Sequence, residues 1–220
     1  MRRIFALLLI ATAASAQVQT KESQAAMTPA RALAILKEGN GRFVAGAREP
    51  RDLKAQVKAT ASGQYPYAAI VSCMDSRVPA ELVFDQGIGD VFSVRVAGNV
   101  VDTDDLGSLE YAAKVTGVRL ILVMGHTACG AVKGAIDDVK MGNLTFLLEK
   151  IRPAIEASGP RGTSKDHAYV DRVAERNVRH TMKEIRERSP ILREMFDTGK
   201  VGLVAAMYDL DTGKVTFLAD

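Results

Sequence analysis

Three near-continuous apolar runs constrain the fold of this chain most, because they predict strands that are buried on both faces. The runs are Ala68 to Ser72, Leu120 to Met124 and Val201 to Met207. Such strands pair in parallel in the middle of a sheet, with helices covering both of its faces. Two further strand candidates, Val91 to Val96 and Lys214 to Leu218, extend this sheet. The chain is therefore predicted to form a single α/β domain with a mostly parallel central sheet.

The segments between the strands supply an edge strand and the helices. Asp209 to Gly213 is typical of a hairpin turn, so the fifth strand should pair antiparallel at an edge, beside four parallel strands. Thr28 and Thr103 are the expected N-caps of their helices, and Pro153 is a candidate kink. Helical periodicity predicts helices over Thr28 to Gly46, Arg51 to Ser62, Thr103 to Gly117, Gly130 to Val139, Leu144 to Ala157 and Asp166 to Arg188.

The N-terminus has the pattern of an export signal. Arg2 and Arg3 precede the apolar run Ile4 to Ala13, and Ala14-Ser15-Ala16 matches the small-x-small pattern of a cleavage site. The apolar run is too short to cross a bilayer, and a frayed N-terminal helix is the alternative interpretation. We expect a signal peptide over residues 1–16, a disordered polar linker over 17–27 and the domain over 28–220, with export to the periplasm or the medium.

The composition argues against nucleic acid and against a membrane as partners of the mature chain. The net charge of +3 falls to about +1 without Arg2 and Arg3, which is too small to favour a polyanionic surface. The chain has no Trp, and it has no basic patch with interleaved aromatic residues. No apolar run after the N-terminus reaches the roughly 18 residues that a membrane span needs.

Chemically reactive side chains follow the first and third strands at the point where each strand ends. Cys73, Asp75 and Arg77 follow the first strand, and His126 and Cys129 follow the third. Open parallel sheets bind ligands outside the carboxyl ends of their strands, and the ends of neighbouring strands lie about 5 Å apart. Two thiolates and one imidazole suit tetrahedral zinc, and three protein ligands leave the fourth position open, as in catalytic zinc sites.

Other interpretations of these residues are open at this point. In an exported protein two cysteines often pair, so a Cys73–Cys129 disulfide is a competing prediction. The fourth zinc position could be filled by water or by the Asp75 carboxylate. His167 and His180 fall in the long C-terminal helix and are expected to be surface residues, with a role in proton relay as the alternative.

The acid and the base beside the first cysteine indicate how a zinc site here would react. Zinc lowers the pKa of a bound water towards 7 and so makes hydroxide available at mild pH. Asp75 can hold and orient that hydroxide, and Arg77 can fork onto Asp75 and keep it ionised. The alternative is that Asp75 and Arg77 form an ordinary surface ion pair.

The chain resembles the β-class carbonic anhydrases in the residues around these strand ends. The similarity extends from about Ala30 to the C-terminus, and it is carried by Cys73-Met74-Asp75-Ser76-Arg77-Val78, Arg95-Val96-Ala97-Gly98-Asn99, Gly125-His126-Thr127-Ala128-Cys129-Gly130, Gly39-Asn40-Gly41-Arg42-Phe43 and Leu109-Glu110-Tyr111-Ala112. The order and spacing of the first and third motifs are highly specific, and they favour zinc over a disulfide. Met74 and Val96 depart from the family pattern, in which Ser and Asn are common there.

The resemblance implies a function and the residues that carry it. It implies one zinc ion per chain on Cys73, His126 and Cys129, with Asp75 and Arg77 as a catalytic dyad. The reaction would be the reversible hydration of carbon dioxide to bicarbonate and a proton, by attack of zinc-bound hydroxide.

Substrate-binding residues and an oligomer are also implied by the resemblance. Gln64 resembles the glutamine that donates a hydrogen bond to substrate in the plant-like, open-site subclass, and Ile70 stands where the other subclass typically has Trp. Phe92, Ala97 and Tyr111 would line a small apolar pocket for carbon dioxide, with residues of a neighbouring subunit contributing, or else would be ordinary core residues. The family further implies homodimers or dimers of dimers that the N-terminal helices embrace.

Two other functions are alternatives. Related enzymes of the same fold hydrolyse carbon disulfide or carbonyl sulfide, and their zinc site would look the same. The chain could also be a non-catalytic exported domain that is held together by zinc or by a disulfide. Asp75, Arg77 and Gln64 argue against that function, because a structural zinc site is closed by its ligands and does not need them.

Overall fold

The computed structural model describes residues 17–219, so the expected signal peptide lies outside the described residues. A five-stranded sheet forms its centre, in the order β2-β1-β3-β4-β5. The strands are β1 (Ala68–Ser72), β2 (Val91–Arg95), β3 (Leu120–His126), β4 (Gly202–Tyr208) and β5 (Val215–Phe217). β1 pairs in parallel with β2 and β3, β3 pairs in parallel with β4, and β5 runs antiparallel to β4. The prediction of four parallel strands and an antiparallel edge strand is confirmed.

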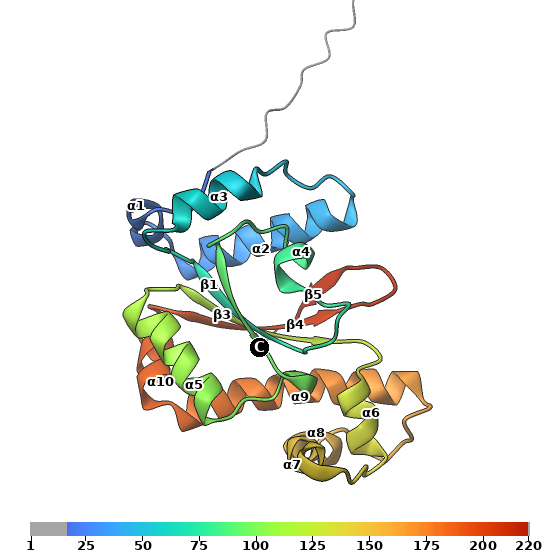
Figure 1. Ribbon diagram of the computed structural model, residues 1–220. Coiled ribbons are helices and arrows are strands. Elements are labelled where there is room, and N and C mark those ends of the chain that lie inside the picture. Colours follow the sequence, from blue (N-terminus) through green and yellow to red (C-terminus); the bar gives the residue numbers. More distant parts are fainter. Residues whose placement is uncertain (1–16, 220) are drawn as a thin grey trace, which may run out of the picture.

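Helices cover both faces of this sheet (Figure 1). None of the helices within residues 17–219 has the length and apolar character to cross a membrane. The structure also contains the 3₁₀ turn η1 (Ala97–Asn99) and the π-helical turn η2 (Tyr111–Val115). The α-helices are α1 (Lys21–Ala25), α2 (Pro29–Val44), α3 (Leu53–Thr60), α4 (Ala80–Val83), α5 (Thr103–Glu110), α6 (Gly130–Ile136), α7 (Gly142–Glu149), α8 (Arg152–Glu156), α9 (His167–Arg188) and α10 (Pro190–Asp197).

The hydrophobic core has three parts. One lies between the sheet and helices α2 and α4, and a second lies between the sheet and helices α5, α9 and α10. The residues of β1 alternate between these two parts, as its pleat requires. The third part lies among α6, α7, α8 and α9 and contains both cysteines. The cysteines are therefore held by packed helices at the end of the sheet.

Residues 17–27 contain α1 instead of the predicted disordered linker. The Thr20 hydroxyl accepts a hydrogen bond from the N–H of Ser23, and the Ser23 hydroxyl accepts one from the N–H of Thr20, which completes a capping box. Gln24 is buried, and its Nε2 donates to the carbonyl oxygen of Pro66 at 2.6 Å. A buried amide with a backbone partner thus anchors a segment whose composition is polar.

The helix α5 is capped by Asp102 and not by Thr103 as predicted. The Asp102 carboxylate accepts a hydrogen bond from the Thr103 N–H at 2.9 Å. Asp105 accepts one from the Asp102 N–H at 2.8 Å, which completes a capping box. The acidic side chain outcompetes the hydroxyl because a charged acceptor makes the stronger hydrogen bond to a backbone N–H.

The predicted helix over Leu144 to Ala157 is divided into α7 and α8. Pro153 lies in the first turn of α8, where its missing N–H leaves no carbonyl unpaired. The same rule explains α10, which was not predicted, because Pro190 occupies the first position of that helix and the Ser189 hydroxyl caps it. The short helix α4 was not predicted either, since four residues carry no periodic signal.

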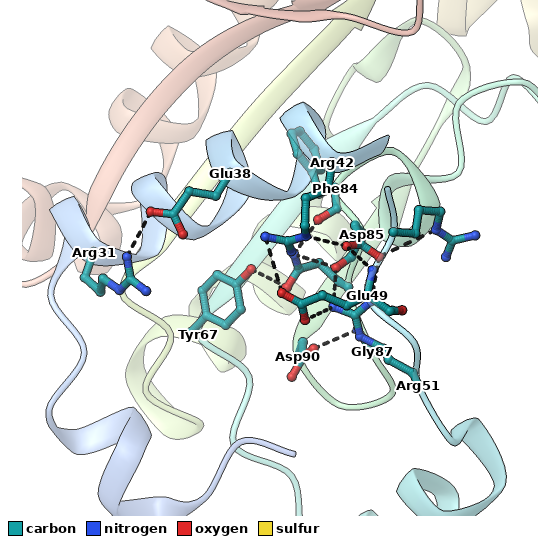
Figure 2. Close-up of polar contacts among 12 residues, drawn as sticks. Arg31, Glu38, Arg42, Glu49, Arg51, Tyr67, Phe84, Asp85, Gly87 and Asp90 are labelled. Carbon is teal, nitrogen blue, oxygen red and sulfur yellow. Dashed lines mark hydrogen bonds and ion pairs between the residues drawn. The ribbon is translucent and has the colours of Figure 1, made fainter. Parts of the chain in front are cut away.

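A buried carboxylate joins α2, the loop after it and the end of α4 (Figure 2). The side chain of Asp85 is fully buried, and it accepts hydrogen bonds from Arg42 at 2.6 Å and from Arg51 at 2.5 Å. The backbone N–H of Glu49 donates to the same carboxylate at 3.1 Å. Burial would raise the pKa of Asp85, but the hydrogen bonds from Arg42, Glu49 and Arg51 lower it overall.

Replacing Asp85 by asparagine should lower the free energy of unfolding by about 3 kcal/mol at pH 7, because Arg42 and Arg51 lose their buried counter-charge and keep only the exposed carboxylate of Glu49. The pKa of Asp85 is depressed in the folded state, so its stabilisation is complete above its unfolded-state pKa of about 3.9. The difference between parent and variant should shrink as the pH falls through the lower folded-state pKa. Urea denaturation of parent and variant over a pH series measures this difference in the free energy of unfolding.

The matched control is Glu38→Gln, which removes a carboxylate from the exposed ion pair with Arg31. Exposed pairs contribute about 0–1 kcal/mol, so this variant should unfold at nearly the parental urea concentration. Equal losses of unfolding free energy in the two variants would mean that the buried Asp85 cluster stabilises the fold no more than an exposed ion pair does.

Candidate metal centre

Cys73, His126 and Cys129 meet at the carboxyl ends of β1 and β3. Their ligand atoms all lie within 4.8 Å of one another, and each residue is at most 4% exposed. β1 and β3 are direct neighbours, so Cys73, just after β1, and His126, the last residue of β3, are adjacent. Cys129 is the N-cap residue of α6. The structure thus brings together the three residues that the sequence predicted as metal ligands.

The donor atoms of this cluster suit a zinc ion. His126 Nδ1 lies 2.9 Å from the carbonyl oxygen of Thr127, so Nδ1 carries the hydrogen and Nε2 presents its lone pair. Nε2 is buried and has no hydrogen-bond partner among the described residues, which a metal ion would supply. Both cysteines are free thiols in the structure, so the alternative of a disulfide is not supported.

The two thiols differ in acidity because they share one hydrogen bond. The hydrogen bond from Cys129, together with that from the N–H of Gly98, outweighs burial and lowers the pKa of Cys73 to about 4. The same shared bond and burial raise the pKa of Cys129 far above its usual range. A thiolate is the form of cysteine that binds metal, so the cluster already favours one of the two required anions.

Asp75 and Arg77 form the predicted pair beside the cluster. Arg77 donates to Asp75 through Nε at 2.9 Å, through Nη2 at 2.7 Å and through its backbone N–H at 2.9 Å. These bonds hold the pKa of Asp75 well below its usual range. Asp75 Oδ2 lies 3.9 Å from Nε2 of His126, so the carboxylate faces the metal position. The pair is therefore part of the site and not an isolated surface ion pair.

Two further residues hold this site, and sequence reasoning assigned them no role. The Arg95 guanidinium donates to the carbonyl oxygens of Cys73 at 3.3 Å and Asp75 at 2.6 Å, which fixes the loop that carries them. The N–H of Gly98 donates to Cys73 Sγ at 3.3 Å. Gly98 has φ +69, and a Cβ there would lie 2.7 Å from Ile151 Cδ1, so only glycine fits. Both residues belong to a motif that carried the family resemblance.

Comparison with known proteins agrees with this site and fold. The β-carbonic anhydrase of Coccomyxa superposes with a TM-score of 0.68 at 26% identity, covering 76% of this chain and 79% of that one. The β-carbonic anhydrase CafA of Aspergillus fumigatus has a TM-score of 0.67 at 27% identity, covering 87% of this chain and 91% of that one. The sequence profile of the carbonic anhydrase family matches residues 68–215. The chain belongs to the β-carbonic anhydrase family.

Relatives within the β-carbonic anhydrases share most of the chain. Carbonic anhydrase 2 of Mycobacterium tuberculosis is 40% identical over 192 residues, which cover 84% of this chain and 91% of that protein. The carbonic anhydrase of Mycolicibacterium smegmatis is 38% identical and covers 85% of this chain and 92% of that protein. The resemblance that the sequence motifs indicated is confirmed. Zinc is the cofactor of this family, and Cys73, His126 and Cys129 offer the group that can hold it.

The remaining residues carried over from the β-carbonic anhydrases lie in three different places. Ala97 is next to Gly98 in η1, beside the cysteine cluster. Phe92 and Tyr111 line one cavity of about 720 Å³ at the free edge of β2. Gln64 is exposed and lies before the first residue of β1, whereas Cys73 follows the last. β1 alone spans about 13 Å, so the Gln64 side chain cannot reach the cluster of its own chain.

The other histidines of the described chain lie away from the cluster. His167 is the first residue of α9 and is exposed, and His180 lies near the middle of that helix and is half-buried. His180 lines a separate cavity of about 210 Å³ together with Lys150, Glu184 and Arg188. The expectation of a surface position agrees with the exposed His167, whereas His180 is half-buried.

Proposed function

We propose that the protein catalyses the zinc-dependent, reversible hydration of carbon dioxide to bicarbonate and a proton. The observation that carries this proposal is the convergence of Cys73, His126 and Cys129 with Asp75 at one end of the sheet. Three ligands from the protein are the number found in catalytic zinc sites, which keep one position for water or substrate. Zinc, when bound, lowers the pKa of a water molecule and so supplies the nucleophile near neutral pH.

Asp75 orients the attacking oxygen in this proposal. Its Oδ2 is the carboxylate oxygen that lies nearest to His126 Nε2, so it can accept a hydrogen bond from a water molecule at the fourth ligand position. Arg77 keeps Asp75 ionised, and its fork holds both carboxylate oxygens in one plane. With its two oxygens engaged by Arg77, Asp75 is positioned to serve as an acceptor, which supports the open-site subclass.

The substrate pocket is completed, in this proposal, by a second copy of the chain. Gln64 is too far from the cluster of its own chain to reach it, and Tyr111 is half exposed in the cavity along the free edge of β2. Two β-carbonic anhydrases of Sordaria macrospora, one of them 25% identical with a TM-score of 0.64, are described as tetrameric. We therefore propose a homodimer or a dimer of dimers in which Gln64 of one chain donates a hydrogen bond to substrate beside the zinc of the other.

A subunit-mixing experiment tests this arrangement. Gln64→Ala should lower kcat/KM about tenfold, because one hydrogen bond to the transition state is worth about 1 kcal/mol or slightly more. Cys73→Ser chains should be inactive. When the two variant chains are mixed, unfolded and refolded together, each mixed dimer should contain one complete site, and activity should exceed the sum of the separate variants.

The control for the mixing experiment is a chain that carries both substitutions. Refolded with the Gln64→Ala chain, it offers no intact glutamine, so no recovery should occur. Recovery in neither mixture would place Gln64 outside the partner's site and would contradict the proposed subunit contribution.

Export to the periplasm or the medium is a further part of the proposal, since residues 1–16 carry the features of a signal peptide. Expression of the full chain in a Gram-negative host should give a periplasmic protein that begins near Gln17. N-terminal sequencing of the fractionated protein checks this prediction. A cytoplasmic protein that still carries residues 1–16 would contradict it.

The reaction itself is tested by zinc analysis of the purified mature protein together with a stopped-flow assay of carbon dioxide hydration. Carbonyl sulfide and carbon disulfide serve as competing substrates, because an enzyme of the same fold that hydrolyses them would have the same ligand set. A protein that binds zinc but acts only on the sulfur compounds would overturn the assignment of carbon dioxide as the substrate.

A further inference from the structure

Helix α9 lies along one face of the sheet, where it packs against β3 and β4 (Figure 1). Its close approach depends on Gly125, the residue before the ligand His126. A Cβ at Gly125 would lie 2.7 Å from Cγ2 of Val178 on α9 and 2.8 Å from Sδ of Met207 on β4. A side chain at this position would force Val178 and Met207 out of their present packing against the strand. The glycine therefore lets one helix contact two loops that position the cysteines. These loops are the η1 turn, which donates a hydrogen bond to Cys73, and the loop between His126 and Cys129.

The first of these loops is the η1 turn. Asn177 of α9 is fully buried, and its Nδ2 donates to the carbonyl oxygen of Gly98 at 2.6 Å. One turn further along, the Thr181 hydroxyl donates to the carbonyl oxygen of Asn99 at 3.1 Å. The N–H of Gly98 in turn donates to Cys73 Sγ. A continuous path of hydrogen bonds thus runs from α9 to the first cysteine.

The second loop joins His126 to Cys129. Asp171 of α9 accepts a hydrogen bond from the N–H of Ala128 at 2.8 Å. Ala128 has φ +54, a left-handed conformation that is unfavourable for a residue with a side chain. The sequence separates Asp171 from Ala128 by more than forty residues, so this contact exists only in the folded chain. The carboxylate stabilises the turn that aims Cys129 at the cluster.

We propose that α9 is the template of the zinc site, and that Asp171 and Asn177 are positioning residues that hold Cys129 and Cys73 at ligand spacing before the metal binds. Neither residue touches the metal position in this arrangement. They act through the backbone of the two loops, one at Ala128 and one at Gly98. This inference rests on the proposed zinc site and deepens it, because it names the residues that hold the two cysteines in place before zinc binds.

The alternative is that these hydrogen bonds only hold the fold together. The two roles differ in what they predict for the folded protein. A positioning residue changes zinc affinity and coordination geometry in a variant that is still folded, and a conservative replacement that keeps the hydrogen-bond acceptor restores both. Outer contacts of this kind typically change metal affinity about 10–100-fold. A contact that serves only the fold changes the free energy of unfolding and nothing else.

The test uses Asp171, since it is partly exposed, whereas Asn177 is fully buried and its replacement endangers the fold. Asp171→Ala removes the acceptor, and Asp171→Asn keeps an acceptor oxygen at nearly the same place. Glu175→Ala is the matched control, because it removes a carboxylate one turn along the same helix, where Glu175 pairs only with Arg179 among the described residues. Circular dichroism first confirms that each variant is folded.

Zinc dissociation constants by chelator competition, and the visible absorption spectrum of the cobalt-substituted protein, are the readouts. We expect Asp171→Ala to bind zinc about 10–100-fold more weakly and to give an altered cobalt spectrum. Asp171→Asn and Glu175→Ala should match the parent in both measurements. Parental zinc affinity and cobalt spectrum in folded Asp171→Ala would overturn the inference, and so would an equal loss in Asp171→Asn. If the parent protein itself bound no zinc, the proposed function would fail instead, so the two failures are distinguishable.

Discussion

Replacing Cys73 by serine is expected to abolish zinc binding and carbon dioxide hydration together. The serine hydroxyl is hard, and it stays protonated at neutral pH, whereas hydrogen bonds lower the pKa of the Cys73 thiol to about 4. Zinc prefers the soft thiolate, and two remaining ligands are fewer than the three of known catalytic sites. The zinc content should fall from about one ion per chain to near zero.

The matched control for this substitution is Met74→Ser, which introduces the same residue one position further along. Met74 is 63% exposed and offers no ligand to the cluster, so its variant should keep its zinc. Metal analysis after gel filtration, combined with the hydration assay, gives both readouts. Full zinc content and full activity in Cys73→Ser would show that the site is wrongly assigned.

The sheet and the metal cluster could be predicted because their signals are local. Each central strand is a near-continuous apolar run, Cys73 follows β1 directly, and His126 is the last residue of β3. Parallel pairing then places the ends of neighbouring strands at one edge without further information. The hydrogen bond of Asp75 with Arg77 is also local, since the two residues are two positions apart.

The supports of the site could not be predicted because their partners are distant in sequence. Nothing near Asp171 or Asn177 indicates that they bond to Ala128 and Gly98, since those contacts require α9 to dock on β3. Gln64 shows the opposite relation between sequence distance and distance in space. It stands only nine residues before Cys73 in the sequence, yet β1 carries it to the other end of the sheet. Residues at opposite ends of one strand are close in sequence but far apart in space, and the family motif alone did not indicate the proposed contribution of Gln64 from a second chain.

Replacing Asp75 by asparagine is expected to separate metal binding from turnover. Asp75 is not one of the three proposed ligands, so the variant should keep about one zinc ion per chain. The amide has no negative charge to orient the attacking oxygen. Its NH₂ group also replaces one of the two oxygens that accept hydrogen bonds from Arg77. Loss of a positioned acid–base group costs about 10²–10⁴-fold in rate, and kcat should fall by that order.

The pH dependence gives this prediction a second readout. Arg77 holds the pKa of Asp75 well below its usual range, so the carboxylate stays ionised throughout the pH range in which hydration is assayed. The variant should therefore lose a similar factor in kcat at every such pH. Asp211→Asn, a replacement of an exposed carboxylate in the hairpin turn, is the control and should leave kcat unchanged. Loss of zinc from Asp75→Asn would make Asp75 a ligand and the site a closed one, and an unchanged kcat would remove Asp75 from the reaction.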